Sequence, residues 1–103
     1  MLIITVMYPS TGGARFDENY YMQSHIPLVQ QRWGSLGLSD VMVLRGVPGP
    51  DGAVPTYSMI AVLTFGSMDQ FKDAGAKHGE EIFADISKFT DAKPVLQFND
   101  SVA

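Results

Sequence analysis

The sequence predicts an α+β domain in which the elements follow one another in the order β-α-β-β-α-β. Runs rich in β-branched and apolar residues alternate in this order with two stretches whose apolar residues recur at helical spacing. The chain has 103 residues and a hydrophobic content of 46%, enough for one core, so we expect a single domain over residues 1–103. No linker or low-complexity segment divides it. This order is that of the ferredoxin-like fold, a four-stranded antiparallel sheet with two helices on one face.

Three of the expected strands are β-rich runs that lie between chain breakers. Residues 2–8 form the first, which ends at the Pro- and Gly-containing loop 9–13. Residues 40–47 form the second strand and residues 57–65 the third. The loop 48–55 between them holds three prolines and two glycines, which favour neither helix nor strand.

The first helix is expected to begin at Asp17 and to end near Gly34 or Gly37, where glycine supplies a left-handed cap. Asp17 suits the N-cap position, because its carboxylate accepts hydrogen bonds from free N–H groups of the first turn. Phe16 and Tyr21 stand at the two positions of a hydrophobic staple. Four apolar residues form a continuous stripe along one side of this helix: Met22, Ile26, Val29 and Trp33.

Pro27 lies well inside this helix. It removes the N–H group that would bond the carbonyl of Gln23, and its ring crowds that carbonyl. We therefore expect the helix to bend at this point. The bend lies beside His25, which is placed at the edge of the apolar stripe between Tyr21 and Leu28.

The second helix is expected to begin at Ser67, because Ser67 and Gln70 have the spacing of a capping box. Gly79 is expected to end or interrupt it, and the helical pattern resumes over residues 80–89. Residues 94–99 form the last strand.

The strands carry apolar side chains on both faces. Residues 2–7 and 59–63 lack the regular polar alternation of a sheet that meets water on one side. Two helices cover only one face, and the chain offers no third layer. Because a bare apolar face of this size favours aggregation, we expect a second copy to cover it. The protein is then an obligate homodimer that associates through the sheet face.

Composition argues against several classes of function. A net charge of −4 and a pI near 4.8 do not suit binding to nucleic acid or to an anionic membrane. The absence of cysteine excludes disulfides, thiolate metal sites and a cysteine nucleophile. The apolar run 1–8 lacks a basic leader and is too short to span a bilayer, so we expect a cytoplasmic protein.

The pair Tyr20-Tyr21 is followed by His25-Ile26-Pro27-Leu28-Val29, and preceded by Tyr8-Pro9 and Phe16-Asp17. Together with a looser match from His78 to Asp91, these motifs resemble the EthD family of small dimeric α+β-barrel proteins, named for ethyl tert-butyl ether degradation. The resemblance implies a ferredoxin-like protomer, a sheet-to-sheet dimer and a pocket between helices and sheet. Some members are cofactor-independent isomerases, decarboxylases or dehydratases that use the helix histidine, and others have no known reaction. The resemblance therefore implies no cofactor.

Two interpretations of His25 remain open. In the first, its side chain bonds the carbonyl that Pro27 frees and only stabilises the bend, since isolated histidines are usually structural. In the second, His25 is a general acid or base, because an imidazole with a pKa of about 6.5 transfers protons readily near neutrality. The family resemblance supports the second interpretation.

His78, the other histidine, either faces inward beside His25 or caps the second helix in solvent. Two histidines in one pocket, with a carboxylate such as Asp17 or Asp85, would be a metal site. The histidines do not form an i, i+4 pair on one helix, so we predict no metal.

The remaining candidates are substrate-binding residues. Arg32 lies at i+7 from His25, where it either holds an anionic substrate or packs its stem over the surface. Four aromatic residues either belong to the core or wall a pocket for a planar ligand: Tyr20, Tyr21, Trp33 and Tyr57.

The leading functional hypothesis is a small cofactor-independent enzyme of the isomerase or lyase type. It would act on a hydrophobic ring or carbonyl compound, with His25 moving a proton and Tyr20, Tyr21 or Tyr57 polarising the carbonyl. The alternative is a carrier that holds a hydrophobic metabolite without converting it. A cofactor-free oxygenase, or a haem protein with a histidine ligand, is a third hypothesis.

Overall fold

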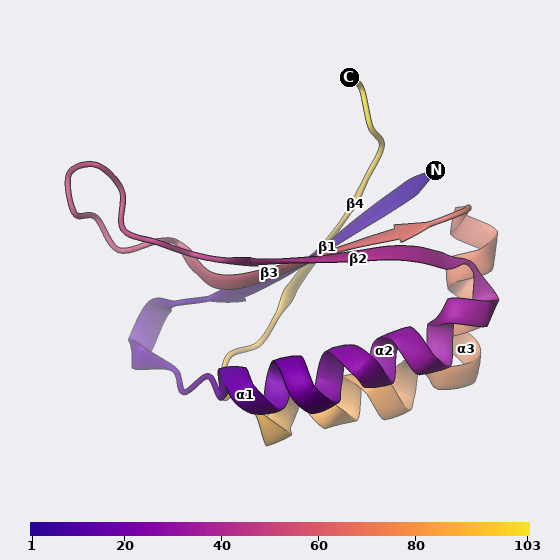
Figure 1. Cartoon of the computed structure of the whole chain (residues 1–103), viewed down its shortest axis with the longest axis horizontal. Coiled ribbons are helices and arrows are strands. Elements are labelled where there is room, and N and C mark those ends of the chain that lie inside the picture. The colour runs from indigo at the N-terminus through magenta and orange to yellow at the C-terminus, as the bar shows by residue number, and fades with distance from the viewer.

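The computed structural model describes all residues 1–103 and has the predicted ferredoxin-like architecture. The four strands form one antiparallel sheet in the order β2-β3-β1-β4. Every helix lies on the same side of this sheet (Figure 1). The strands are β1 (Leu2–Pro9), β2 (Leu38–Arg45), β3 (Tyr57–Phe65) and β4 (Val95–Asn99).

Strand β2 begins and ends two residues before the predicted positions. Leu38 is buried and pairs with Phe65 of β3, so the ladder starts directly after Gly37. Gly37 has a φ of 113°, a left-handed conformation that glycine adopts without strain, and it ends the preceding helix as predicted. At the other end, a Cβ on Gly46 would overlap the backbone of Tyr57, so the glycine allows the close approach of the two chains there.

The helix-facing side of the sheet forms the floor of the core. Alternate residues of β1 and β3 are buried there, while their neighbours are only half-buried. The strictly alternating burial follows from the period of two in side-chain direction along a strand. The floor residues are Leu2, Ile4, Val6 and Tyr8 of β1 and Met59, Ala61, Leu63 and Phe65 of β3.

The opposite side of the sheet, here called the outer face, carries a row of apolar side chains, as predicted. Met7, Ile60, Leu44 and Val95 lie in one row across the four strands, because Met7 pairs with both Ile60 and Val95 and Ile60 pairs with Leu44. Leu44 and Val95 are 44% and 45% exposed. In Figure 1 no helix covers this face.

The first helical rod runs through three segments without a break (Figure 1). Its start is as predicted, because the Asp17 carboxylate accepts a hydrogen bond from the Tyr20 N–H at 3.1 Å. The staple is also formed, with the rings of Phe16 and Tyr21 5.0 Å apart. The segments are α1 (Glu18–Tyr20), the π-helical turn η2 (Tyr21–His25) and α2 (Ile26–Trp33).

At the place where Pro27 was predicted to bend the helix, the structure has this π-helical turn. The Ile26 N–H bonds the carbonyl of Tyr21, five residues back, directly before the proline that cannot donate. Because this turn contains one residue more than a turn of α-helix, a different side of the helix meets the core. Tyr21 and His25 are therefore buried, whereas Met22, predicted to belong to the apolar stripe, is 42% exposed.

The second long helix is α3 (Met68–Asp85), followed by the 3-10 turn η4 (Ile86–Lys88). Ser67 caps it as predicted, accepting a hydrogen bond from the Gln70 N–H at 3.1 Å. The predicted interruption at Gly79 is wrong. A mid-helix glycine costs about 1 kcal/mol relative to alanine, which is too little to break a helix held on both sides of Gly79 by buried Ala74 and Ile82. None of the helices combines the length and apolar composition that crossing a bilayer requires.

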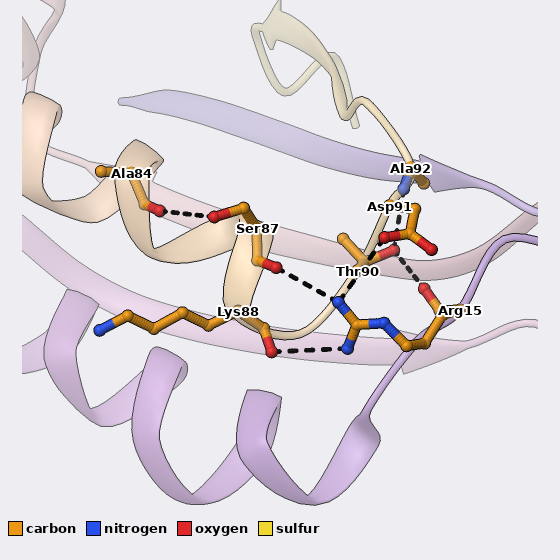
Figure 2. A network of polar contacts seen from close by, with 7 residues as sticks. All are labelled: Arg15, Ala84, Ser87, Lys88, Thr90, Asp91 and Ala92. Atoms are coloured by element: carbon orange, nitrogen blue, oxygen red, sulfur yellow. Dashed lines mark hydrogen bonds and ion pairs between the residues drawn. The ribbon is translucent and has the colours of Figure 1, made fainter.

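A network of polar contacts ties the end of α3 to the segment before α1 (Figure 2). The Arg15 guanidinium donates to the Ser87 carbonyl at 3.2 Å, and its own carbonyl accepts a hydrogen bond from the Thr90 hydroxyl at 2.5 Å. The Asp17 N–H donates to the Phe89 carbonyl at 2.7 Å. These contacts fix the C-terminal end of α3 beside the first turns of the other helix.

Candidate functional site

A small cavity lies between the helices and the sheet. Its volume is about 30 Å³, enough for little more than water. Of its 15 lining residues, 14 are hydrophobic, and His25 is the exception. The cavity is therefore an apolar chamber with one titratable base in its wall.

His25 is paired with Asp85 inside the protein. The Nδ1 atom of His25 lies 2.9 Å from Oδ2 of Asp85, and the two residues are 3% and 8% exposed. They are 60 residues apart, one on the π-helical turn η2 and the other at the last position of α3. An ionised carboxylate only accepts hydrogen bonds, so Nδ1 carries the proton and Nε2 keeps its lone pair. No hydrogen bond within the chain engages Nε2.

Asp85 is held in its ionised form by three neighbours. Burial opposes its charge, but the hydrogen bonds from His25 and Tyr20 outweigh this effect and lower the pKa of Asp85 below its ordinary value. The Tyr20 hydroxyl donates to Oδ1 at 2.8 Å, and the Lys88 ammonium lies 3.5 Å from the same oxygen. Donation to this carboxylate in turn raises the pKa of Tyr20.

The imidazole of His25 is neutral near pH 7. Burial lowers its pKa below the ordinary value of 6.5, and the hydrogen bond to Asp85 offsets this only in part. A neutral imidazole whose Nδ1–H is fixed by a carboxylate has a defined basic atom, Nε2. It can take a proton there, and the adjacent carboxylate then stabilises the imidazolium.

Aromatic rings hold the His25 imidazole in place. It stacks on the Tyr21 ring at 5.7 Å with an interplanar angle of 16°, and the Phe89 ring lies 4.7 Å away. Phe89 also contacts the rings of Tyr8, Phe16, Tyr20 and Tyr21. The histidine is thus fixed by packing as well as by its hydrogen bond.

Tyr21 offers a second polar group at the cavity. It is fully buried and lines the cavity, and its hydroxyl is the one buried side-chain polar atom without a hydrogen-bond partner. Burial raises the pKa of Tyr21, so the hydroxyl keeps its proton. Because buried polar groups are normally hydrogen-bonded, this unpaired hydroxyl is a candidate donor to an oxygen of a bound ligand.

The buried His25–Asp85 pair predicts that the protein loses stability in mild acid. The pKa of His25 is lower in the folded protein than its ordinary 6.5, so the unfolded chain takes up the proton first as pH falls. The free energy of unfolding should therefore decrease as pH drops below about 6.5. Asp85, whose folded pKa is also lowered, adds a further loss below its ordinary value of 3.8. Urea titrations between pH 8 and pH 3 measure both losses.

The control for this pH effect is His25→Gln, which removes the titrating ring. Its unfolding free energy should depend less on pH between 7 and 5 than that of the natural protein. A natural protein that becomes more stable over this interval as pH falls would contradict the buried neutral imidazole.

The structure brings only some of the predicted site residues together. Besides His25, the cavity is lined by Tyr21 and Trp33, and the Trp33 indole N–H donates to the Ala74 carbonyl at 2.9 Å. Tyr20 reaches Asp85 rather than the cavity. His25 bonds this carboxylate and not the carbonyl that Pro27 was predicted to free.

The other predicted residues lie outside the cavity lining. Arg32 forms an ion pair with Glu81 at 2.8 Å on the protein surface. His78 is half-buried on α3, and Tyr57 stands at the start of β3. Asp85 was not assigned as the partner of His25, because 60 residues separate them and no sequence spacing joins them.

Comparisons with known proteins agree with this geometry. The family model described as the EthD domain matches residues 13–93. An EthD-like protein from Ralstonia eutropha is 38% identical with a TM-score of 0.91, and the match covers 99% of this chain and 92% of that one. An ethyl tert-butyl ether (EthD) family protein from Bacillus halodurans is 20% identical with a TM-score of 0.78, and the match covers 99% of each chain.

A more distant structure shares the fold alone. It is a cofactor-independent oxygenase from Streptomyces nogalater, 12% identical with a TM-score of 0.62, and the match covers 99% of this chain and 91% of that one. A comparison with curated proteins gave no match.

Proposed function

Because the chain belongs to the EthD domain family, we propose that it is a cofactor-independent enzyme that moves a proton on a small hydrophobic ring or carbonyl compound. The observation that carries this proposal is the His25–Asp85 pair, whose free Nε2 is the basic atom of an otherwise hydrophobic cavity wall. The cavity holds little more than water, so a ring compound can occupy it only when side chains of the lining move apart. Its apolar lining then selects an apolar ligand, and a single oriented base suits one proton transfer.

The proposed chemistry is abstraction of a proton from a carbon next to a carbonyl. The C–H electron pair moves into the new C=C bond, the carbonyl becomes an enolate, and Nε2 of His25 takes the proton. The Tyr21 hydroxyl, which has no hydrogen-bond partner within the protein, donates a hydrogen bond to the enolate oxygen. In a β,γ-unsaturated carbonyl compound the enolate is conjugated, and return of a proton from His25 to its γ-carbon completes an isomerisation. In D₂O the proton held on Nε2 exchanges with solvent before the return, so deuterium enters the compound.

A deuterium-exchange experiment tests this function without knowledge of the substrate. The protein is incubated in D₂O with a panel of cyclic ketones and lactones, and loss of the α-proton signal is followed by NMR. The natural protein should accelerate exchange of at least one compound, and His25→Gln should not. Binding of a compound without exchange would instead assign the protein as a carrier. Consumption of dissolved oxygen would assign it as an oxygenase.

The protein is also proposed to act as a homodimer that associates through the outer face of the sheet. The row of Leu44, Ile60, Met7 and Val95 offers the apolar surface that a second copy would bury. Light scattering at micromolar concentration should give about twice the chain mass of 11.2 kDa. Ile60→Glu, which places a charge at the centre of this row, should give the monomer mass.

The matched control for the dimer is Met68→Glu, which charges an exposed apolar residue of α3, on the helical side of the molecule. It should leave the mass unchanged. A natural protein that stays folded and monomeric at low micromolar concentration would contradict the proposed dimer.

A further inference from the structure

We propose that the ligand enters the cavity between α3 and the edge strand β4, and that the side chain of Phe83 controls this entrance. The inference rests on the proposed function, because it concerns the route to the same cavity. It adds a residue that contacts the entering ligand but not the reacting atoms.

The exposure of the lining residues locates the entrance. Twelve of the 15 residues that line the cavity are buried. The other three are half-buried or exposed, and here they are called the mouth: Phe71, Phe83 and Leu96. Phe71 and Phe83 lie on α3 and Leu96 on β4, which is an edge strand of the sheet. The cavity therefore reaches the surface on the side where α3 faces β4.

A surface groove continues outside the mouth. Its volume is about 470 Å³, and it lies beside the segment that joins η4 to β4. Phe83 and Ile86 line both this groove and the cavity. Ile86 is buried, whereas Phe83 is 40% exposed. Phe83 is thus the exposed member of the boundary between the groove and the cavity.

The surroundings of Phe83 leave its ring room to move. A Cβ on Gly79, one turn earlier in α3, would lie 4.0 Å from the nearest carbons of the Phe83 ring. Side chains of a helix point toward its N-terminus, so this is the position over which the Phe83 ring lies. Because Gly79 has no side chain, it leaves this path free.

The walls of the mouth indicate the kind of molecule that passes. Phe71 stands between the rings of Trp33 inside and Phe98 outside, at centroid distances of 5.8 and 5.4 Å. Such a path favours a planar apolar molecule over a charged one. Its polar end would enter first, because the cavity lining holds the His25 imidazole and the tyrosines Tyr8 and Tyr21.

Trp33 provides a reporter that needs no ligand. It is the single tryptophan of the chain, it is 2% exposed, and it lines the cavity. Collisional quenching of its fluorescence by acrylamide, followed through the excited-state lifetime, therefore measures entry of a small neutral molecule. Phe83→Ala should raise the quenching rate constant severalfold while the melting temperature stays close to that of the natural protein.

The matched control is Met68→Ala, which removes a side chain of similar exposure from the same helix but away from the cavity, and it should leave quenching unchanged. A second experiment introduces a single cysteine for chemical labelling, because the chain has none of its own. Phe83→Cys should also raise quenching, and labelling it with N-cyclohexylmaleimide should lower quenching again by blocking the mouth.

Quenching that is the same in the natural protein, in Phe83→Ala and in labelled Phe83→Cys would overturn the proposed entrance. Quenching that rises equally in Met68→Ala would also overturn it, because access would then reflect general loosening of the fold. These results are independent of the deuterium-exchange experiment. If the protein exchanges no proton but Phe83→Ala still raises quenching, the proposed entrance stands and the proposed chemistry does not.

Discussion

His25→Gln should lower turnover of a substrate found by deuterium exchange by about 10²- to 10⁴-fold, the usual contribution of a positioned general acid or base. Glutamine is similar in size to histidine, so the packing around the site should be largely preserved. Its amide nitrogen takes the place of Nε2 rather than that of Nδ1, which weakens the hydrogen bond to Asp85. What glutamine lacks is a basic nitrogen in the place of Nε2. The loss should therefore appear in kcat, with a smaller change in KM.

The control for His25 is His78→Gln, because His78 lies on α3 and does not line the cavity. It should retain close to full turnover. Melting temperatures measured on both variants separate a loss of chemistry from a loss of fold. A His25→Gln protein that is stable and fully active would contradict the proposed mechanism and remove His25 from the proton transfer.

Phe89→Ala should cause the largest loss of stability, about 3–5 kcal/mol in the free energy of unfolding, as for other buried phenylalanines. The Phe89 side chain is fully buried, and its ring lies against five others, including that of His25. Its removal leaves a cavity where the start of the first helix meets the end of η4. Urea unfolding at one fixed protein concentration measures the change, since the proposed dimer would make stability depend on concentration.

Phe98→Ala is the comparison for this effect. Phe98 is 44% exposed and contacts one ring, that of Phe71. Its replacement should cost far less than that of Phe89. Equal losses for the two variants would show that the cluster around Phe89 contributes no more than an ordinary surface contact.

Local signals predicted much of the fold. Asp17 and Ser67 cap the helices as their sequence context indicates, because capping depends only on residues within one turn. Gly37 takes the left-handed conformation that ends the first helix. The apolar outer face also followed from residue type alone, since the two faces of a strand can be read by alternation.

The candidate site was only half predictable, because its key contact joins distant parts of the chain. His25 was identified from its motif, but Asp85 lies 60 residues away on another helix. The π-helical turn was hidden as well. Tyr20 and His25 both bond Asp85, although residues five apart on a regular α-helix point about 140° away from each other. The prediction assumed regular α-helical spacing, and it therefore placed Met22 in the core and His25 at the edge of the core.

The π-helical turn also bears on how the length of this segment can change in evolution. A relative with one residue fewer between Tyr20 and His25 would have the two side chains four apart, on the same side of an ordinary α-helix. Loss of one residue here would convert the widened turn to regular helix and keep both groups facing the carboxylate. A gap of one position in this segment of an alignment is therefore compatible with an unchanged site.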